Sequence, residues 1–141
     1  MPAQPHRDYS DTPLWKKLGI REGSRILITG EVPEGFSAGP LPPAAELLRR
    51  PGKDMDVALL FSTSIAEIAR RLPALAKRMD PAGRLWIAWP KRAAKVVTDT
   101  TFENVQAVGL DAGLVDNKSA SITDVFQGMQ FVIRLKDRPK R

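Results

Sequence analysis

Four short apolar segments along the chain predict the strands of a sheet. They cover residues 26–29, 57–61, 85–89 and, with more interruption, 131–135. The second and third read VALLF and LWIAW, without the polar residues that alternate with apolar ones in a half-exposed strand. Uninterrupted apolar strands are typical of a parallel sheet that is covered on both faces. We therefore expect a parallel sheet between two outer layers.

Between these segments, apolar residues recur at helical spacing. Residues 64–79 form the clearest helical stretch, with apolar positions three and four residues apart at Ile65, Ile68, Leu72, Leu75 and Met79. Such spacing places side chains on one helix face. Ser64 and Glu67 match a capping box at its start. Pro73 lies inside the pattern, so we expect a kink or two abutting helices.

Weaker patterns predict the remaining elements. A helix over residues 101–114 would have Thr100 and Glu103 as its capping box and Gly113 as its terminator. Short helices are expected over residues 12–18 and 44–50, the first with Pro13 at its first position. Residues 119–126 and 130–135 predict a β-hairpin that turns at Gln127 and Gly128.

This order of elements predicts an α/β fold. We expect three α/β/α layers around a mostly parallel, five-stranded sheet that ends in an antiparallel β-hairpin. The expected organisation is a flexible N-terminus over residues 1–11, a single α/β domain over 12–135 and a basic tail over 136–141.

Composition removes several classes of function. The chain has no cysteine, which excludes disulfides and thiolate metal sites. His6, the only histidine, lies in the polar N-terminus, so we expect neither a Ser-His-Asp triad nor a histidine metal site on the fold. We predict no catalytic residue, no metal and no cofactor. Without a signal-peptide pattern or a membrane-spanning apolar segment, the expected location is the cytoplasm, with no membrane partner.

The net charge of +6 raises the question of nucleic-acid binding. Residues 134–141 hold five basic residues and one acidic residue, so most of the excess charge belongs to the tail. Paired basic residues elsewhere offer further phosphate contacts: Lys16, Lys17, Arg49, Arg50, Arg70 and Arg71. Non-specific nucleic-acid association through this basic surface is one alternative, and it requires the pairs to share one face of the molecule.

Two resemblances follow from particular segments. MDPAGRLWIAW (residues 79–89) and GSRILITG (residues 23–30) are similar to strands and turns of the S-adenosylmethionine-dependent methyltransferase fold. That family has a G-x-G-x-G cofactor loop, whereas Gly30 is followed here by EVPEGF. About 26 residues separate the first two apolar strands, too few for the two strands, one ending in the ribose-holding acid, that the family carries there. The resemblance therefore implies a truncated scaffold without the standard cofactor site.

The second resemblance is to a bacterial domain-of-unknown-function family, DUF 3052. It rests on YSDTPLWKKLGI, LLFSTS, WIAWPKR and AVGLDAGLVDNKSASI, which together extend over most of the chain. The family implies no activity.

Candidate binding residues gather where the predicted parallel strands end, because ligands of open α/β sheets bind at that edge. The candidates are Gly30, Glu31, Glu34, Gly35, Ser62, Thr63, Ser64, Trp89, Lys91 and Arg92. The serines precede a helix whose N-terminus favours anions, although simple capping explains them too. Lys91 and Arg92 would neutralise an anion or lie in a solvated loop, and Trp89 would stack on a ring or belong to the core. Asp116, Asn117 and Lys118 are expected in a turn at the opposite edge.

The preferred hypothesis is a small binding or regulatory module. It would hold an anionic small molecule or a protein partner at this edge. Besides nucleic-acid association, the other alternative is a transferase with a non-standard cofactor site, for which the acidic pair Glu31 and Glu34 offers little support.

Overall fold

The computed structural model describes residues 12–138 of the chain. Its elements, in chain order, are α1 (Leu14–Leu18), β1 (Arg25–Gly30), β2 (Glu46–Leu48), β3 (Met55–Phe61), α2 (Ile65–Ala76), β4 (Met79–Pro90), η1 (Arg92–Ala94), α3 (Phe102–Asp111), β5 (Leu114–Ser121), β6 (Phe126–Ile133) and η2 (Leu135–Asp137). The expected flexible N-terminus, with His6, and the last three residues of the expected tail lie outside the described residues.

The strands form one mixed sheet in the order β2-β1-β3-β4-β6-β5. The first four strands of that order run parallel, and β6 pairs antiparallel with both β4 and β5. The expected α/β fold with a terminal antiparallel hairpin is confirmed. The expected count of five strands is wrong, because β2 adds a sixth strand at the edge beside β1.

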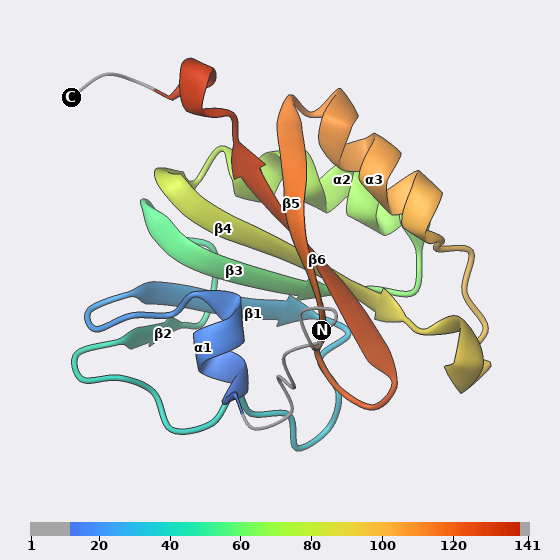
Figure 1. Cartoon of the computed structure of the whole chain (residues 1–141), viewed down its shortest axis with the longest axis horizontal. Helices are drawn as coiled ribbons and strands as arrows, with labels where there is room; N and C mark the ends of the chain where they lie inside the picture. Colours follow the sequence, from blue (N-terminus) through green and yellow to red (C-terminus); the bar gives the residue numbers. More distant parts are fainter. Residues whose placement is uncertain (1–11, 139–141) are drawn as a thin grey trace, which may run out of the picture.

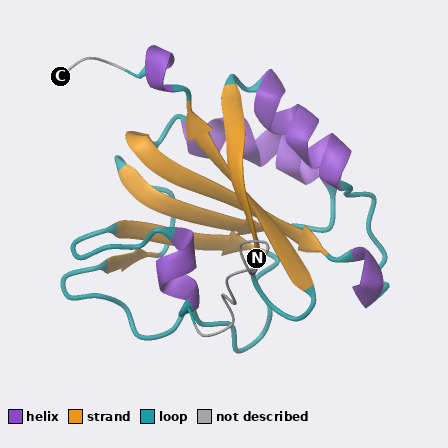
Figure 2. Ribbon diagram, viewed as in Figure 1, coloured by secondary structure: helices purple, strands orange, loops and turns teal. Residues whose placement is uncertain are grey.

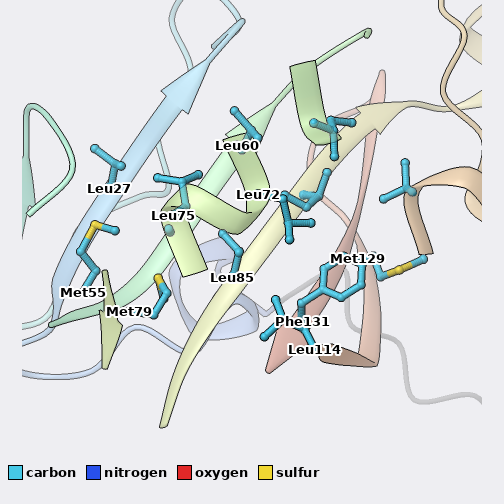
Figure 3. Close-up of a cluster of buried hydrophobic side chains, with 14 of the residues drawn as sticks. Leu27, Met55, Leu60, Leu72, Leu75, Met79, Leu85, Leu114, Met129 and Phe131 are labelled. Atoms are coloured by element: carbon cyan, nitrogen blue, oxygen red, sulfur yellow. The ribbon is translucent and has the colours of Figure 1, made fainter. Parts of the chain in front are cut away.

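The two faces of the sheet are covered by unlike layers (Figures 1 and 2). Helices α2 and α3 cover one face, where they bury the cluster of side chains in Figure 3, including Leu60, Leu72 and Phe131. On the other face, Leu18 of α1 packs with Phe61, Trp86 and residues of the β1–β2 connection. That connection contains no helix, so the second outer layer consists of α1 and loop.

The predicted helix over residues 44–50 is wrong, because residues 46–48 form strand β2. The local sequence favours a helix, but the edge of β1 offers unpaired backbone groups. Glu46 pairs with Arg25 in the parallel register, and its N–H donates to the Ser24 carbonyl over 2.8 Å. Strand pairing with β1 therefore overrides the helical preference of this segment.

Helix α2 ends three residues earlier than predicted, since Met79 begins β4, and it is one helix rather than two. Pro73 lies in its last turn, where it removes only the hydrogen bond to the carbonyl of the exposed Ala69. Pro13 occupies the N-cap of α1 and precedes its first helical residue.

The predicted capping box of α3 is displaced by one residue. Thr101 Oγ1 accepts from the Asn104 N–H over 3.0 Å, and Asn104 Oδ1 accepts from the Thr101 N–H over 2.8 Å. Thr100 is buried instead, with its hydroxyl 2.7 Å from that of Thr98. Burial of Thr100 leaves its neighbour to cap the helix.

The hairpin turn also differs from the prediction. It lies between Ser121 and Phe126, and Thr123 Oγ1 accepts the N–H groups of Val125 and Phe126. Gly128 is inside β6, where an added Cβ would lie 2.8 Å from Ile122. Close packing across the strand requires that glycine, so it does not mark a turn. Within residues 12–138, no helix has the length and apolar character to cross a membrane.

Candidate functional site

The carboxyl ends of β1, β3 and β4 lie side by side. Gly30 pairs with Phe61, and Phe61 pairs with Ala88, so the residues that follow each strand emerge at one edge of the sheet. The candidates after each strand, from Glu31, Ser62 and Lys91 onward, therefore share this edge, but they do not form one cavity.

The end of β1 is tightly closed against β3. Gly30 has a φ of +88°, and a Cβ at this position would lie 2.2 Å from the Phe61 carbonyl oxygen. The Glu31 N–H donates to that same oxygen over 2.9 Å. The Glu31 carboxylate accepts from the N–H of Thr63 over 2.8 Å and also from its hydroxyl. The backbone of β1 thus stays attached to β3 through the turn.

The N-terminus of α2 is satisfied by the chain's own side chains. Ser64 Oγ accepts from the Glu67 N–H, as the capping prediction requires, whereas the Glu67 carboxylate accepts from the Ser62 hydroxyl over 2.6 Å. The Ser62 hydroxyl oxygen accepts from the Ser64 N–H over 3.1 Å. Asp99, which sequence reasoning missed, accepts from the Ile65 N–H over 2.8 Å. Glu31 and Asp99 therefore supply the negative charge that an external anion would have brought to this helix end.

Glu34 and Gly35 lie in the exposed part of the β1–β2 connection. Gly35 has a φ of +74°, and a Cβ added there would have no atom within 4 Å. Its positive φ shapes the turn, and it lines neither cavity described below. The next residue, Phe36, packs edge-on against Phe61 with ring centroids 5.0 Å apart. This connection therefore covers the sheet with an aromatic contact.

A cavity of about 440 Å³ opens at the carboxyl end of β4. Its walls come from the end of β4, the β4–α3 connection, the first turn of α3 and β6: Trp89, Pro90, Lys91, Arg92, Val96, Thr98, Thr100, Thr101, Phe102, Glu103 and Gln127. We call this the β4-end cavity. A neighbouring hollow of about 340 Å³ shares Trp89, Lys91, Phe102 and Gln127 and extends along β5 to Ser119 and Ser121.

The β4-end cavity combines aromatic and cationic side chains. Trp89 is 2% exposed and makes an edge contact with Phe102, whose ring is 43% exposed. Lys91 Nζ donates to Ser121 Oγ over 2.8 Å, and Arg92 is exposed. Glu103 contributes one carboxylate to the lining. This arrangement suits a ligand with a flat ring and negative charge.

The β4–α3 connection is held against the segment between β3 and α2 by Thr98 and Asp99. The Thr98 hydroxyl donates to the Thr63 carbonyl over 2.6 Å, and Asp99 binds the start of α2. Val97, in the same connection, is 95% exposed, and Val96 is 40% exposed. The wall of the cavity is therefore held at one end and presents apolar side chains to solvent at its rim.

Three of the ten candidate residues line the β4-end cavity: Trp89, Lys91 and Arg92. Sequence reasoning missed the threonines, Phe102 and Gln127. The threonines had one signal, the position of the β4–α3 connection at the carboxyl edge. Phe102 was predicted as a core residue of a helix and Gln127 as part of the hairpin turn. The seven candidates on β1 and before α2 contribute to neither this cavity nor the neighbouring hollow.

Asp116, Asn117 and Lys118 do not form the predicted turn, since they are part of β5. Asp116 accepts from Gln106 of α3, and Asn117 accepts from Gln130 of β6. Lys118 Nζ donates to the Lys17 carbonyl over 2.8 Å. Pairing with β6 makes this polar stretch an exposed edge strand, and Lys91 contacts Ser121 at its far end.

The basic pairs do not share one face. Lys16 and Lys17 belong to α1, which packs on one side of the sheet, whereas Arg70 and Arg71 belong to α2 on the other side. The Arg71 guanidinium donates to Thr29 Oγ1 over 3.2 Å. Of the tail, Leu135–Asp137 form a 3₁₀ turn, and Arg138 donates to the Ile133 carbonyl. The geometric condition for a single basic surface is not met by these pairs.

The S-adenosylmethionine-dependent methyltransferases that the sequence resembles hold their cofactor in a glycine-rich loop after the first strand, a site that the sequence predicts to be lost here. Strand β2, next to β1, is followed by the basic residues Arg49 and Arg50 and not by an acidic residue. The Glu31 carboxylate is occupied by Thr63, and the turn after Gly30 is closed on Phe61. The residues present at the end of β1 therefore do not fit that cofactor.

No protein-family model and no curated protein sequence matches the chain. Among solved structures, it is similar to magnesium protoporphyrin IX methyltransferase from Synechocystis PCC 6803 with bound SAM (TM-score 0.55, 10% identity, 86% of this chain, 74% of that one). It is also similar to a variant of LepI in complex with SAH and a substrate analogue (0.55, 14%, 86% and 39%). A third is the Methanococcus jannaschii fibrillarin pre-rRNA processing protein (0.52, 12%, 81% and 67%).

These likenesses concern the fold alone, because every identity is low. The chain covers between 34% and 82% of the length of eight similar structures, and five of them are covered to 51% or less. The strand order and the terminal antiparallel hairpin agree with the likeness. The chain has the α/β, Rossmann-like fold of S-adenosylmethionine-dependent methyltransferases.

Proposed function

We propose that this chain is a small binding or regulatory module that holds an anionic, ring-containing small molecule in the β4-end cavity. The observation that carries the proposal is the lining of that cavity, where the exposed ring of Phe102 and the edge of Trp89 stand beside Lys91 and Arg92. Its volume of about 440 Å³ is in the range of small-molecule sites.

The aromatic, cationic and hydroxyl side chains of the lining each have a role toward such a ligand, whereas the Glu103 carboxylate has none. The Phe102 ring supplies a flat apolar contact, and its exposure is relieved when a ligand covers it. Lys91 is held by Ser121, so its ammonium group is positioned before a ligand arrives. The hydroxyls of Thr98 and Thr101 add short polar contacts at the wall. The ligand class is therefore a monoanionic or dianionic ring compound.

The four segments quoted for DUF 3052 support membership of that bacterial family, and a cytoplasmic setting is part of the same proposal. If the chain is instead a transferase with a non-standard cofactor site, the cofactor would occupy the same cavity. The same experiment therefore tests cofactor binding.

The test is a thermal-shift screen followed by titration. The purified chain is scanned with AMP, adenosine, an acyl-CoA, S-adenosylmethionine and a short oligonucleotide. A ligand at 100 times its Kd raises the free energy of unfolding by about 2.7 kcal/mol, which is a shift of several degrees in Tm. We expect AMP to shift Tm more than adenosine does, and S-adenosylmethionine to give no shift.

Two variants locate the binding. Lys91→Gln and Phe102→Ala should each weaken AMP binding about tenfold, the usual loss for one charged or aromatic contact. Lys77→Gln is the matched control, because Lys77 is an exposed lysine at the C-terminus of α2. Equal binding by wild type and both cavity variants would contradict the proposal, and a shift with S-adenosylmethionine would restore the cofactor hypothesis.

A further inference from the structure

A second cavity lies at the opposite, amino-terminal edge of the parallel strands. Its volume is about 370 Å³, and its lining is strongly polar. Three arginines contribute positive charge: Arg21 of the α1–β1 connection, Arg84 of β4 and Arg138 after β6. Asp56 and Asp80 contribute two carboxylates. We call it the amino-edge cleft. It shares no residue with the β4-end cavity.

The alternation of β4 and β6 places these residues on the face that carries α1. Trp86 lies on that face, pairs with Gln130, and donates from its indole N–H to the Leu18 carbonyl over 3.1 Å. Helix α1 ends directly after Leu18, at Gly19 with a φ of +88°. The helix therefore covers Trp86 but stops beside Arg84, two residues earlier on β4.

The side chain of Arg84 fills the space in which any residue other than glycine at position 19 would place its Cβ. A Cβ on Gly19 would lie 2.4 Å from Arg84 Cδ and 2.6 Å from its Nε. The guanidinium therefore rests against the backbone of the α1 C-terminus at the wall of the cleft. Lys118 of β5 pairs with Gln130 and places its ammonium group 5.9 Å from the centre of the Trp86 ring. That ammonium group donates to the Lys17 carbonyl over 2.8 Å, so Lys118 lies beside α1 and outside the lining of the cleft.

The cations at this wall repel one another. Within residues 12–138, neither Arg84, Arg21 nor Lys118 makes an ion pair. Partial burial, and then repulsion from Arg21, lowers the pKa of Arg84. Partial burial, and then repulsion from Arg84, lowers the pKa of Lys118. Arg84 and Arg21 both line the cleft, so an anion bound there would offset the repulsion between them.

The cleft also offers hydrogen-bond acceptors. Gln130 is 2% exposed and donates from Nε2 to Asn117 Oδ1, while its side-chain oxygen has no hydrogen-bond partner among the described residues. A buried acceptor without a donor is costly, so a ligand or water donor is expected there. Asp56, whose Oδ2 accepts from the Arg25 N–H, places its carboxylate in the same lining. Carboxylate oxygens also accept hydrogen bonds from hydroxyl groups.

We propose that the amino-edge cleft binds a phosphorylated polyol, a compact sugar phosphate in chemical class. The phosphate would lie against Arg84, Arg21 and Arg138, and hydroxyl groups of the sugar would donate to Asp56 and the Gln130 oxygen. A phosphate group accepts strong charge-assisted hydrogen bonds from such cations, and a neutral sugar would leave them unpaired. This proposal is independent of the function assigned to the β4-end cavity.

The experiment uses calorimetric titration of the full chain with three probes: ribose 5-phosphate, inorganic phosphate and ribose. We expect saturable binding of ribose 5-phosphate, weaker binding of inorganic phosphate and none of ribose. Arg84→Gln should weaken ribose 5-phosphate binding about tenfold or more, as the loss of a charged hydrogen bond does. Arg78→Gln, an exposed arginine outside the cleft lining, should leave binding unchanged.

Several results would overturn the inference. The proposal is wrong if ribose 5-phosphate shows no saturable binding. It is also wrong if wild type and Arg84→Gln bind ribose 5-phosphate equally. Equal affinity for inorganic phosphate and ribose 5-phosphate would show that the sugar is not recognised. Tighter binding of a short oligonucleotide would show that the cations of the cleft bind nucleic acid. Should Arg84→Gln not fold, amide chemical shifts of the wild type decide, since the signals of Arg84, Arg21 and the Gln130 side-chain amide must move when ribose 5-phosphate binds. Lys91→Gln should leave ribose 5-phosphate binding intact, which separates this site from the β4-end cavity.

Discussion

Replacing Gly109 by alanine should destabilise the protein, against the ordinary expectation for a glycine inside a helix. Gly109 lies in α3 and is buried against the sheet. An alanine normally gains about 1 kcal/mol over glycine at such a position. Here, however, an added Cβ would lie 2.0, 2.4 and 2.6 Å from three ring carbons of Phe131. Atoms cannot approach so closely, so either the ring or the helix must move.

The size of the effect follows from how little room Phe131 has. Its side chain is 1% exposed and packs in the cluster with Leu114 and Met129. Overpacking a tight core costs about 1–3 kcal/mol, occasionally more. Since the contact involves three ring atoms, we expect a cost at the upper end, which the helix propensity of alanine offsets in part. The expected net loss is about 2 kcal/mol in the free energy of unfolding.

Urea unfolding followed by tryptophan fluorescence measures this loss, because Trp86 and Trp89 are both buried. Phe131→Leu serves as the relieving background, since leucine leaves space for the new methyl group. In that background, Gly109→Ala should cost at least about 1 kcal/mol less, as expected for residues in direct contact. If Gly109→Ala is as stable as the wild type or more stable, the packing of α3 on Phe131 described here is incorrect.

Three further substitutions test other parts of the structure. Asp99→Ala removes the acceptor of the Ile65 N–H and should lower the free energy of unfolding by about 1 kcal/mol; a thermal melt measures it, and Asp124→Ala, in the exposed β5–β6 turn, should leave Tm nearly unchanged. Gly30→Ala combines a positive φ with a Cβ 2.2 Å from the Phe61 oxygen and should cost about 3 kcal/mol or more in urea unfolding, whereas Gly35→Ala, in open space, should cost only about 1–2 kcal/mol. The pKa of Lys118 is lowered by burial and by Arg84, so between that lowered pKa and 10.5 the unfolded state binds more protons and the contribution of Lys118 to stability rises with pH. Urea midpoints of wild type and Lys118→Met, compared at increasing alkaline pH, should therefore move in favour of the wild type, and a constant difference would contradict this assignment.

The candidate site was predictable in its location and less so in its composition. Parallel strands deliver their following residues to one edge, so Glu31, Ser62 and Lys91 could be placed together from the order of elements alone. Which of them faces a cavity depends on hydrogen bonds across long stretches of sequence. Asp99 reaches the start of α2 from 34 residues away, and Glu31 reaches Thr63 from 32 residues away. No local pattern announces such partners.

The amino-edge cleft could not be predicted in the same way. Its cations come from segments that lie far apart in the sequence, and Arg84 reads simply as a polar residue before an apolar run. The glycine that admits its side chain, Gly19, reads as an ordinary helix terminator. Only the packing of α1 across the sheet brings the two together.

By itself, the sequence determined the buried strands, the amphipathic helix and the class of fold, because hydrophobic burial follows local periodicity. Residues 57–61 and 85–89 are apolar without interruption, and such segments are stable only between two layers. Tertiary structure decided the rest. Residues 46–48 form a strand because β1 offers an unpaired edge. Position 128 requires glycine because the Ile122 side chain packs against its Cα. Both outcomes depend on neighbours that the chain acquires only on folding, where one pairing or one contact outweighs a local preference of about 1 kcal/mol.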